Sequence, residues 1–259
     1  MRLEHRSVEQ FQRSGWLTLP GLLSPEQVDS LRKWADQIDQ LQDDRWLKYY
    51  EISSEGCKVL SRIESFVQPG CPIEFLVQSS GPLIGVLAEL FRDEPVLFKD
   101  KVNLKPPGGG AYTAHQDAPA YRGFGISDFI TAMVAIDEAT VTNGCLEFAA
   151  GPRVTGELEL DETGQIMAPQ LANLRFDPAP IRSGDIVVFD GLVPHRSAPN
   201  SSGSARRALF LTFNPRKQGE KRATYYEAKR QFFPPEDQRE AGRDYRKSGG
   251  QFNLGNPFV

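Results

Sequence analysis

Apolar residues in the first part of the chain recur at helical spacing. Within the helical stretch 7–41, the run SVEQFQRSGWLTL predicts a helix that ends at Gly15 and leads into a short strand. Ser24 and Pro25 are typical of a second helix start, because serine caps the first turn and proline fits its first position. The apolar face of this second helix carries Val28, Leu31, Trp34 and Ile38.

A third helix is expected over residues 82–92, in the run PLIGVLAELFR. We therefore expect a largely helical N-terminal part over about residues 1–94. From residue 95 the pattern changes to short runs rich in β-branched and aromatic residues, separated by Gly, Pro and Asn. These runs are PVLFKDKVNLK, DFITAMVAID, CLEFA, DIVVFDG and ALFLTFN.

Short strands that follow a helical part favour a mainly β fold with flanking helices, a sandwich or barrel whose core spans about residues 95–215. Residues 153–180 read as a long polar insertion, which is typical of a lid or a binding loop. The C-terminal extension, residues 216–259, is charged but contains aromatic residues. We expect this extension to pack over the core, partly as helix.

Length and charge narrow the classes of function. The 259 residues fit one domain over 1–259, and the net charge of −4 offers no basic excess for nucleic acid or an anionic membrane. No segment approaches the roughly eighteen apolar residues of a membrane span, and the N-terminus lacks the apolar run of a signal peptide. Cys57, Cys71 and Cys145 have neither zinc-site nor disulfide spacing, which favours a reducing, cytoplasmic setting. A small molecule is the expected partner, and the oligomeric state stays open.

Two of the three histidines stand in a pattern that suggests a metal site. His115 and Asp117 are two residues apart, so on a strand both side chains point to the same face. His195 follows a separate strand and turn, in GDIVVFDGLVPHRSAP. Two histidines and one carboxylate form the facial triad of non-haem Fe(II) oxygenases, which leaves open positions on the metal.

Arg206 adds a second element to this constellation. It stands eleven residues after His195, at the start of the strand RALFLTFN, and Ser197 lies between them. An arginine can bind a carboxylate through two parallel hydrogen bonds. A 2-oxoacid that chelates iron at one end needs such a partner at its other end.

At this point the sequence resembles the phytanoyl-CoA dioxygenase family, through HQDAPAY, NGCLEFAAGPR, GDIVVFDGLVPHRSAPN and the later arginine. The resemblance runs from about residue 8 to about residue 215. It implies a double-stranded β-helix (jelly-roll, cupin-like) core and a dioxygenase that uses Fe(II), 2-oxoglutarate and O2. The expected product is a hydroxylated substrate, with succinate and CO2 released.

The resemblance also implies roles for individual residues. His115, Asp117 and His195 would ligate iron, and Arg206 with Ser197 would hold the distal carboxylate of 2-oxoglutarate. The cosubstrate pocket would be lined by Gln116 and by Thr131 or Met133. For Ser197 and Gln116, an ordinary turn or strand polar group is an equal alternative. The phytanoyl enzyme has tryptophan in place of Met133, which argues against copying its acyl-CoA substrate.

The run FKDKVNLK carries the clearest sign of the substrate. Apolar Phe98, Val102 and Leu104 are expected to face the outer helices, and the polar residues between them form the opposite face. The polar residues are Lys99, Lys101, Asn103 and Lys105. We expect Lys101 and Asn103, joined by Arg122, to bind a small polar metabolite, a class that includes anionic phosphonate- or carboxylate-like molecules. The alternative is a solvated edge strand, where lysines commonly block aggregation.

Two other classes of function stay open at this stage. One is a non-enzymatic cupin-like binding or sensor protein, and the other is a cupin isomerase. Neither gives a reason for Arg206 at its spacing from His195.

Overall fold

The computed structural model describes residues 3–41, 43–53, 56–162, 164–245 and 249–256. Its helices, including single 3-10 turns (η), are α1 (His5–Ser14), α2 (Pro25–Gln37), η1 (Glu74–Leu76), α3 (Pro82–Phe91), η2 (Ala118–Tyr121), α4 (Ala168–Leu171), η3 (Arg216–Gln218), α5 (Arg222–Phe232), η4 (Glu236–Gln238) and η5 (Gly250–Asn253). Its strands are β1 (Trp16–Leu19), β2 (Leu47–Ile52), β3 (Lys58–Glu64), β4 (Pro95–Lys105), β5 (Tyr112–His115), β6 (Ile130–Ala135), β7 (Leu146–Ala149), β8 (Phe176–Pro178), β9 (Ile186–Asp190), β10 (His195–Ser197) and β11 (Arg206–Pro215).

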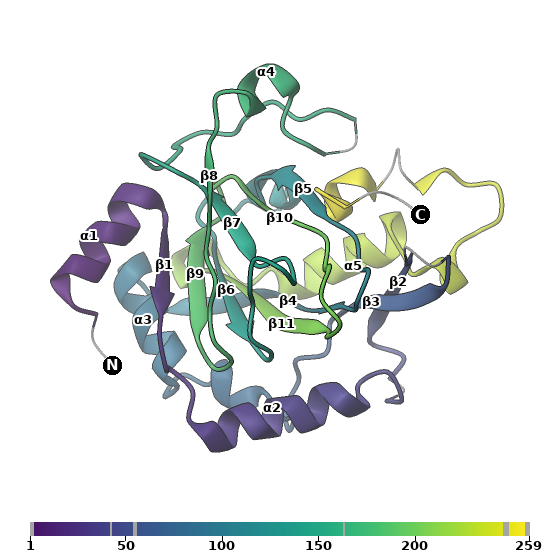
Figure 1. Ribbon diagram of the computed structural model, residues 1–259, viewed down its shortest axis with the longest axis horizontal. Helices are drawn as coiled ribbons and strands as arrows, with labels where there is room; N and C mark the ends of the chain where they lie inside the picture. Colours follow the sequence, from purple (N-terminus) through teal and green to yellow (C-terminus); the bar gives the residue numbers. More distant parts are fainter. Residues whose placement is uncertain (1–2, 42, 54–55, 163, 246–248, 257–259) are drawn as a thin grey trace.

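The strands form two antiparallel sheets. The larger sheet has the order β1-β9-β6-β11-β4-β3-β2, and the smaller has the order β5-β10-β7-β8 (Figure 1). Buried side chains of both sheets, such as Met133, Phe148 and Phe189, pack together between them. This sandwich is the mainly β architecture expected from the short strand-forming runs.

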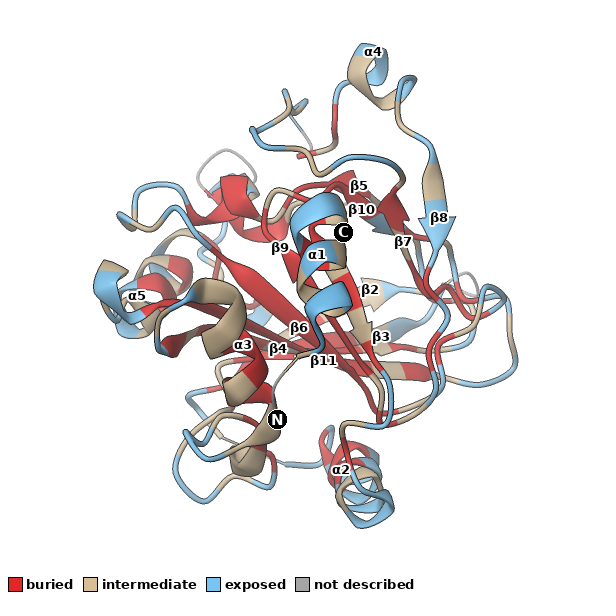
Figure 2. Ribbon diagram, turned by 90° about the vertical axis from the view of Figure 1, so that its left-hand side faces the viewer, coloured by how far each residue is buried: buried red, intermediate tan, exposed pale blue. Residues whose placement is uncertain are grey.

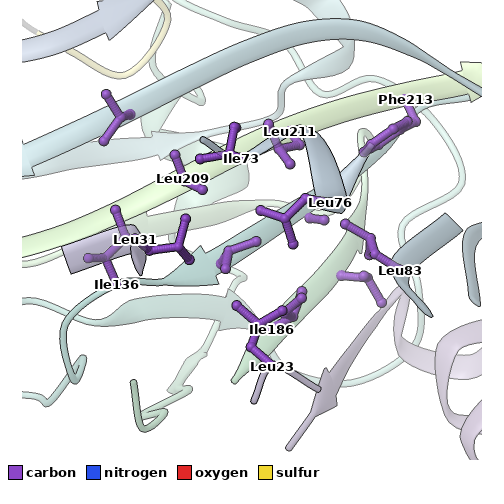
Figure 3. Close-up of a cluster of buried hydrophobic side chains, with 14 of the residues drawn as sticks. Leu23, Leu31, Ile73, Leu76, Leu83, Ile136, Ile186, Leu209, Leu211 and Phe213 are labelled. Carbon is purple, nitrogen blue, oxygen red and sulfur yellow. The ribbon is translucent and has the colours of Figure 1, made fainter. Parts of the chain in front are cut away.

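Helices α1, α2 and α3 cover the outer face of the larger sheet. α2 begins with a capping box: the side chain of Ser24 accepts from the backbone of Gln27, and the Gln27 side chain accepts from the backbone of Ser24. The apolar face of α2 then buries Leu31 and Trp34 against the sheet, while its other side is exposed (Figure 2). Figure 3 shows this outer core, in which Leu31 lies among residues from β9 and β11.

Gly15 sets the turn from α1 into β1, as predicted. Its φ of 79° lies in the left-handed region, and its N–H caps α1 by donating to the carbonyl of Phe11. A Cβ at this position would stand 2.4 Å from Cγ2 of Val193. A side chain would therefore push α1 away from the turn that leads to His195.

The expectation of a largely helical part over residues 1–94 was wrong in its middle section. β2 and β3 form a hairpin that extends the larger sheet next to β4. A period of two was visible in β2, where Leu47 and Tyr49 are buried and Lys48 and Tyr50 are less so. These strands bring Arg62 and Glu64 to the inner face of the sheet.

One side chain of β4 points to the sheet face opposite to the predicted one. Val102 and Leu104 pack with the outer core as expected. Phe98 instead contacts Tyr121 and Tyr225 in a separate aromatic cluster. The reason is a register shift in the pairing of β4 with β11, where Lys99 pairs with Thr212 but Leu97 pairs with Phe213. Phe98 therefore has no pairing partner in β11. A bulge of this kind reverses the face to which the preceding side chains point.

The C-terminal extension packs over one end of the sandwich, as predicted. Tyr225, Tyr226 and Lys229 of α5 are buried. Figure 1 shows the last described residues next to β5, and the backbone N–H of Thr113 donates to the carbonyl of Gly255 at 2.7 Å. Among the described residues, no helix is long and apolar enough to cross a membrane.

Candidate active site

His115, Asp117 and His195 come together at one edge of the smaller sheet. His115 ends β5, His195 begins β10, and the two residues are direct partners in the antiparallel pairing. One potential ligand atom from each of the three residues lies within 4.8 Å of the others. The structure thus assembles the three side chains that the sequence selected, from segments eighty residues apart.

Hydrogen bonds to backbone carbonyls orient both imidazoles in the same way. Nδ1 of His115 lies 2.7 Å from the carbonyl oxygen of Thr113, and Nδ1 of His195 lies 3.0 Å from that of Val193. A carbonyl can only accept, so each Nδ1 carries the proton and each Nε2 keeps its lone pair. A metal-binding histidine needs this tautomer. The donor set and its outer shell therefore fit Fe(II).

Burial and nearby charges favour the protonation states of His115 and Asp117 that bind a metal ion. Burial and the neighbouring His195 lower the pKa of His115 to about 3. Burial alone would raise the pKa of Asp117, but the imidazoles of His195 and His115 and the ammonium of Lys101 lower it. At neutral pH the site presents a neutral imidazole and a carboxylate, the forms that bind a cation.

Arg206 lies deep in the sandwich at the start of β11. Its side chain is 1% exposed, and its Nε and Nη1 have no hydrogen-bond partner among the described residues. Its cross-strand partner is Lys105, whose Nζ donates to Oγ of Ser197 at 3.0 Å and to the carbonyl of Ala198. We call Arg206, Lys105 and Ser197 the Arg206 lobe. Burial and the charge of Arg206 lower the pKa of Lys105 to about 7, and the opposing effect of Glu51 is smaller.

Thr131 and Met133 both face the interior from β6. Oγ1 of Thr131 donates to Oδ2 of Asp117 at 3.4 Å and lies 3.0 Å from Oγ1 of Thr212. Met133 is paired with Phe210 and packs in the apolar core between the sheets. Thr131 thus lies beside the carboxylate of the triad, while Met133 forms part of the apolar wall.

Gln116 does not have the pocket-lining role expected for it. It follows His115 on the opposite side of the backbone and uses its amide on the 153–180 insertion. Its Nε2 donates to the carbonyls of Gly156 and Leu192, and its Oε1 accepts from the N–H of Leu158 at 2.7 Å. Gln116 therefore anchors the base of the insertion beside the triad.

Arg122 does not join the basic row either. Its side chain is 63% exposed and pairs with Glu157 of the insertion. It lines an outer cavity of about 490 Å³ with Leu160 and Leu254. The 3-10 turn η2 after Asp117 leads the chain outward, which a strand-like reading of this segment could not show.

The lysine row lies inside the sandwich and not on a solvated edge. β4 is hydrogen-bonded on both sides, to β11 and β3, so the edge-strand alternative is wrong. Lys99, which is 8% exposed, lies over the rings of Tyr121 and Tyr225. Nζ of Lys101 lies 4.6 Å from the ring centre of Phe210. Desolvation is the main cause that lowers the pKa of Lys101 to about 7, and the charge of Lys99 is the second. Neither ammonium has a salt bridge among the described residues.

The row continues across the sheet through residues that sequence reasoning missed. Arg62 is the direct cross-strand partner of Asn103, and Glu64 is that of Lys101. We call these four residues the β3–β4 patch. Glu64 is fully buried, its Oε2 accepts from Nζ of Lys229 at 2.6 Å, and its Oε1 lies 3.1 Å from Nε of Arg62. Burial opposes the charge of Glu64, but Lys229, Lys99 and Arg62 lower its pKa to about 2.

Gly255, from the C-terminal extension, lies directly against His115. Its φ is 72°, and a Cβ there would stand 2.3 Å from Nδ1 of His115. Its carbonyl accepts from both the N–H and Oγ1 of Thr113, the residue whose own carbonyl holds the His115 ring. The end of the chain thus supports the metal site from outside.

Comparison with known proteins decides the family. A family model described as phytanoyl-CoA dioxygenase (PhyH) matches residues 11–208. The chain belongs to the phytanoyl-CoA dioxygenase family. The class predicted from the sequence is confirmed: this is an Fe(II)- and 2-oxoglutarate-dependent dioxygenase, with O2 as a further cosubstrate. The non-enzymatic cupin-like protein and the cupin isomerase are left without support.

Two curated relatives within this family match nearly the whole chain. A 2-aminoethylphosphonate dioxygenase from uncultured bacterium HF130_AEPn_1 is 37% identical, over 96% of this chain and 96% of its own length. A methylphosphonate hydroxylase from Gimesia maris is 34% identical, over 91% of this chain and 90% of its own length.

Solved structures of similar shape confirm the jelly-roll fold. EctD from S. alaskensis, solved with 2-oxoglutarate and 5-hydroxyectoine, has a TM-score of 0.68 and 19% identity, over 83% of this chain and 77% of its own. AviO1 from Streptomyces viridochromogenes Tue57 has a TM-score of 0.65 and 22% identity, over 83% of this chain and 96% of its own.

Proposed function

We propose that this dioxygenase hydroxylates a C–H bond of a small organophosphonate. The observation that carries the proposal is the pair of ammonium groups on β4, buried Lys99 and half-buried Lys101, for which no described carboxylate forms a salt bridge. A buried charge is costly unless it is paired, so the missing partner is expected to be a bound anion. The two relatives named for phosphonate substrates support the same class.

His115, Asp117 and His195 are the proposed ligands of Fe(II). When bound, the metal supplies the activation of O2 that couples decarboxylation of 2-oxoglutarate, to succinate and CO2, to hydroxylation of the substrate. Thr131 holds Asp117 through its hydroxyl, and Thr113 and Val193 hold the two imidazoles.

The Arg206 lobe is the proposed site for the distal carboxylate of 2-oxoglutarate. Two guanidinium nitrogens of Arg206 are buried and have no hydrogen-bond partner in the part of the chain that the structure describes, and its cross-strand partner Lys105 donates to the hydroxyl of Ser197. A carboxylate offers the acceptors that these donors lack. Met133 and Phe210 belong to the apolar core between the sheets, and Nζ of Lys101 lies 4.6 Å from the ring centre of Phe210.

Lys101 and Asn103 are the proposed contacts to the phosphonate substrate. Both project from β4 on the same face as Lys105, but Lys105 lies at the end of the strand next to Arg206. The row therefore serves two anions, 2-oxoglutarate at the Arg206 end and the substrate at the other. This division keeps the two anions apart while both stay near the triad.

The surroundings of the site suggest two further points. We expect the 153–180 insertion, which Gln116 anchors at its base, to act as a lid over the cavity beside Arg122. The cytoplasm is the expected compartment, because the three cysteines are free.

The direct test measures succinate formed from 2-oxoglutarate, with Fe(II) and ascorbate present. Methylphosphonate and 2-aminoethylphosphonate are each added, and acetate and β-alanine serve as carboxylate counterparts. The proposal requires that a phosphonate stimulates turnover several-fold and becomes hydroxylated. Stimulation by the carboxylates alone would move the substrate to another class while leaving the dioxygenase assignment intact.

A further inference from the structure

The β3–β4 patch carries charge of both signs on one face of the larger sheet. Arg62 and Lys101 lie on one diagonal of the patch, and Glu64 and Asn103 lie on the other, because Arg62 pairs with Asn103 and Glu64 pairs with Lys101. Cross-strand partners and diagonal neighbours on one sheet face are within reach of a single small ligand. The patch therefore offers cations and hydrogen-bond acceptors in alternation.

The acceptors of the patch are not fully used by the protein. Oδ1 of Asn103 and Oε1 of Glu64 are buried and have no hydrogen-bond partner among the described residues. Lys229 occupies only the other oxygen of Glu64, and Arg62, although 3.1 Å away, is not aligned to donate to Oε1. A buried acceptor without a donor destabilises the fold. A ligand that carries its own N–H donors would remove this penalty.

The cations are in excess over the carboxylate. Four cationic side chains surround Glu64, namely Arg62, Lys99, Lys101 and Lys229. Lys229 is paired with Glu64, and aromatic rings hold Arg62 over Tyr49 and Lys99 over Tyr121. An aromatic face steadies a cation but does not neutralise it. The patch as a whole therefore requires a ligand with a net negative head group.

We propose that the β3–β4 patch recognises a zwitterion, an aminoalkylphosphonate. Arg62 and Lys101, supported by Lys99, bind the phosphonate, and Asn103 with Glu64 accepts hydrogen bonds from the ammonium. This inference rests on the proposed function and narrows its substrate from phosphonates in general to those with an amine. A simple alkylphosphonate would pair with Arg62 and Lys101. It would offer no N–H donor to the acceptor oxygens of Asn103 and Glu64.

The test compares binding of two ligands of similar size to the enzyme. The enzyme, loaded with Fe(II) and 2-oxoglutarate, is titrated without oxygen by calorimetry with 2-aminoethylphosphonate and then with propylphosphonate. We expect 2-aminoethylphosphonate to bind at least roughly tenfold more tightly, because a site built for a substrate N–H discriminates strongly against the analogue that lacks it. Equal affinities would overturn the zwitterion assignment. Succinate formation stimulated by both phosphonates would still leave the proposed function standing.

Variants at Asn103 and Arg62 separate the parts of the patch. Asn103→Leu should reduce the preference for the amine by roughly tenfold, whereas Asn103→Asp, which keeps the acceptor, should retain the preference. Arg62→Met should weaken binding of both phosphonates about equally, and Arg45→Met is the matched control because Arg45 is exposed and pairs only with Asp43 in a salt bridge among the described residues. An unchanged preference in Asn103→Leu, or an Arg62→Met variant as silent as Arg45→Met, would contradict the assignment. Circular dichroism before each titration identifies variants that fail to fold.

Discussion

At the scale of single residues, Arg206 carries buried N–H donors for which the described residues provide no acceptor. It is almost completely buried, and burial lowers the pKa of its guanidinium. Its neighbour Arg207 is the opposite case, since it pairs with Asp137 at 2.7 Å and with Asp36. Adjacent residues of one strand face opposite ways, so one arginine faces the site and the other holds the outer surface.

Removing the Arg206 side chain should weaken binding of 2-oxoglutarate. We expect Arg206→Ala to raise the KM for 2-oxoglutarate by roughly tenfold or more, which corresponds to about 1.4 kcal/mol per decade. Arg207→Ala should lower the midpoint of urea unfolding through its lost ion pairs and leave this KM nearly unchanged. The reverse pattern in steady-state kinetics would show that the strand phase has been misassigned.

Each histidine of the triad should be indispensable for iron. We expect His115→Ala and His195→Ala to lose Fe(II) binding and to reduce succinate formation by at least roughly a hundredfold, since changes even in an outer shell cost ten- to a hundredfold. His5→Ala is the control, because His5 is exposed on α1. Isothermal titration with Fe(II) without oxygen and circular dichroism separate metal loss from unfolding. Succinate formation near the wild-type rate in either variant would refute the triad.

The residues that sequence reasoning found and those that it missed differ in a physical way. His115 and Asp117 are two residues apart, and Arg206 follows His195 by eleven residues, and such short spacings are visible in a sequence even though Asp117 lies just beyond the end of β5. Arg62 enters the proposed site only because a distant hairpin pairs with β4. Gln116 and Arg122 flank the motif, but their side chains are directed by the 153–180 insertion, whose path the local pattern does not determine.

At the scale of elements, strand pairing decides which side chains meet the substrate. The alternation in FKDKVNLK was enough to separate Lys101 and Asn103 from Val102 and Leu104. It failed at Phe98, because a bulge depends on the partner strand and leaves no mark in the alternation itself. The tight contact of Gly255 with His115 was equally hidden, since it joins segments far apart in the chain.

A side chain at Gly255 should disturb the metal site. We expect Gly255→Ala to lower Fe(II) affinity by roughly tenfold or more, because the added Cβ displaces the His115 ring and the positive φ disfavours alanine. Gly250→Ala is the matched control, since a Cβ there meets open space within the same extension. Metal affinity is measured by titration, together with the KM for 2-oxoglutarate. Equal affinity in the two variants would mean that the extension does not position His115.

At the scale of the whole molecule, the C-terminal extension ties the active site to the rest of the fold. Lys229 of α5 and Glu64 of β3 form a fully buried ion pair between segments 165 residues apart. The aromatic cluster around Tyr225 packs against the same end of the sandwich. We therefore expect residues 1–259 to unfold as one cooperative unit, although the family model itself ends at residue 208.

Breaking this ion pair should destabilise the entire protein. Lys229→Met leaves Glu64 without its closest partner, and removal of one member of a buried pair typically costs about 3–5 kcal/mol. Lys33→Met, which removes an exposed pair with Asp29, should leave the midpoint of urea unfolding nearly unchanged. Urea unfolding followed by fluorescence and by circular dichroism measures both variants. Similar losses in the two would show that the buried pair is not a main link.

The pH dependence of stability has a definite sign. The pKa of Glu64 is lowered from 4.5 to about 2 in the fold, so its contribution is fully present above pH 4.5 and is lost as the pH falls toward 2. In Lys229→Met this pKa should rise, and part of the acid loss should move to higher pH. Urea midpoints measured from pH 2 to pH 6 record the shift, and identical curves for the two proteins would contradict it.

The most direct test of the account is stoichiometric turnover with a single substrate. Purified enzyme is given Fe(II), ascorbate, O2, 2-oxoglutarate and 2-aminoethylphosphonate, and succinate and the phosphorus-containing product are measured together. We predict that succinate and hydroxylated phosphonate form in a ratio near one, and that omission of the phosphonate leaves only slow, uncoupled loss of 2-oxoglutarate. Succinate formation that is the same with and without any phosphonate, with no hydroxylated product, would contradict the account.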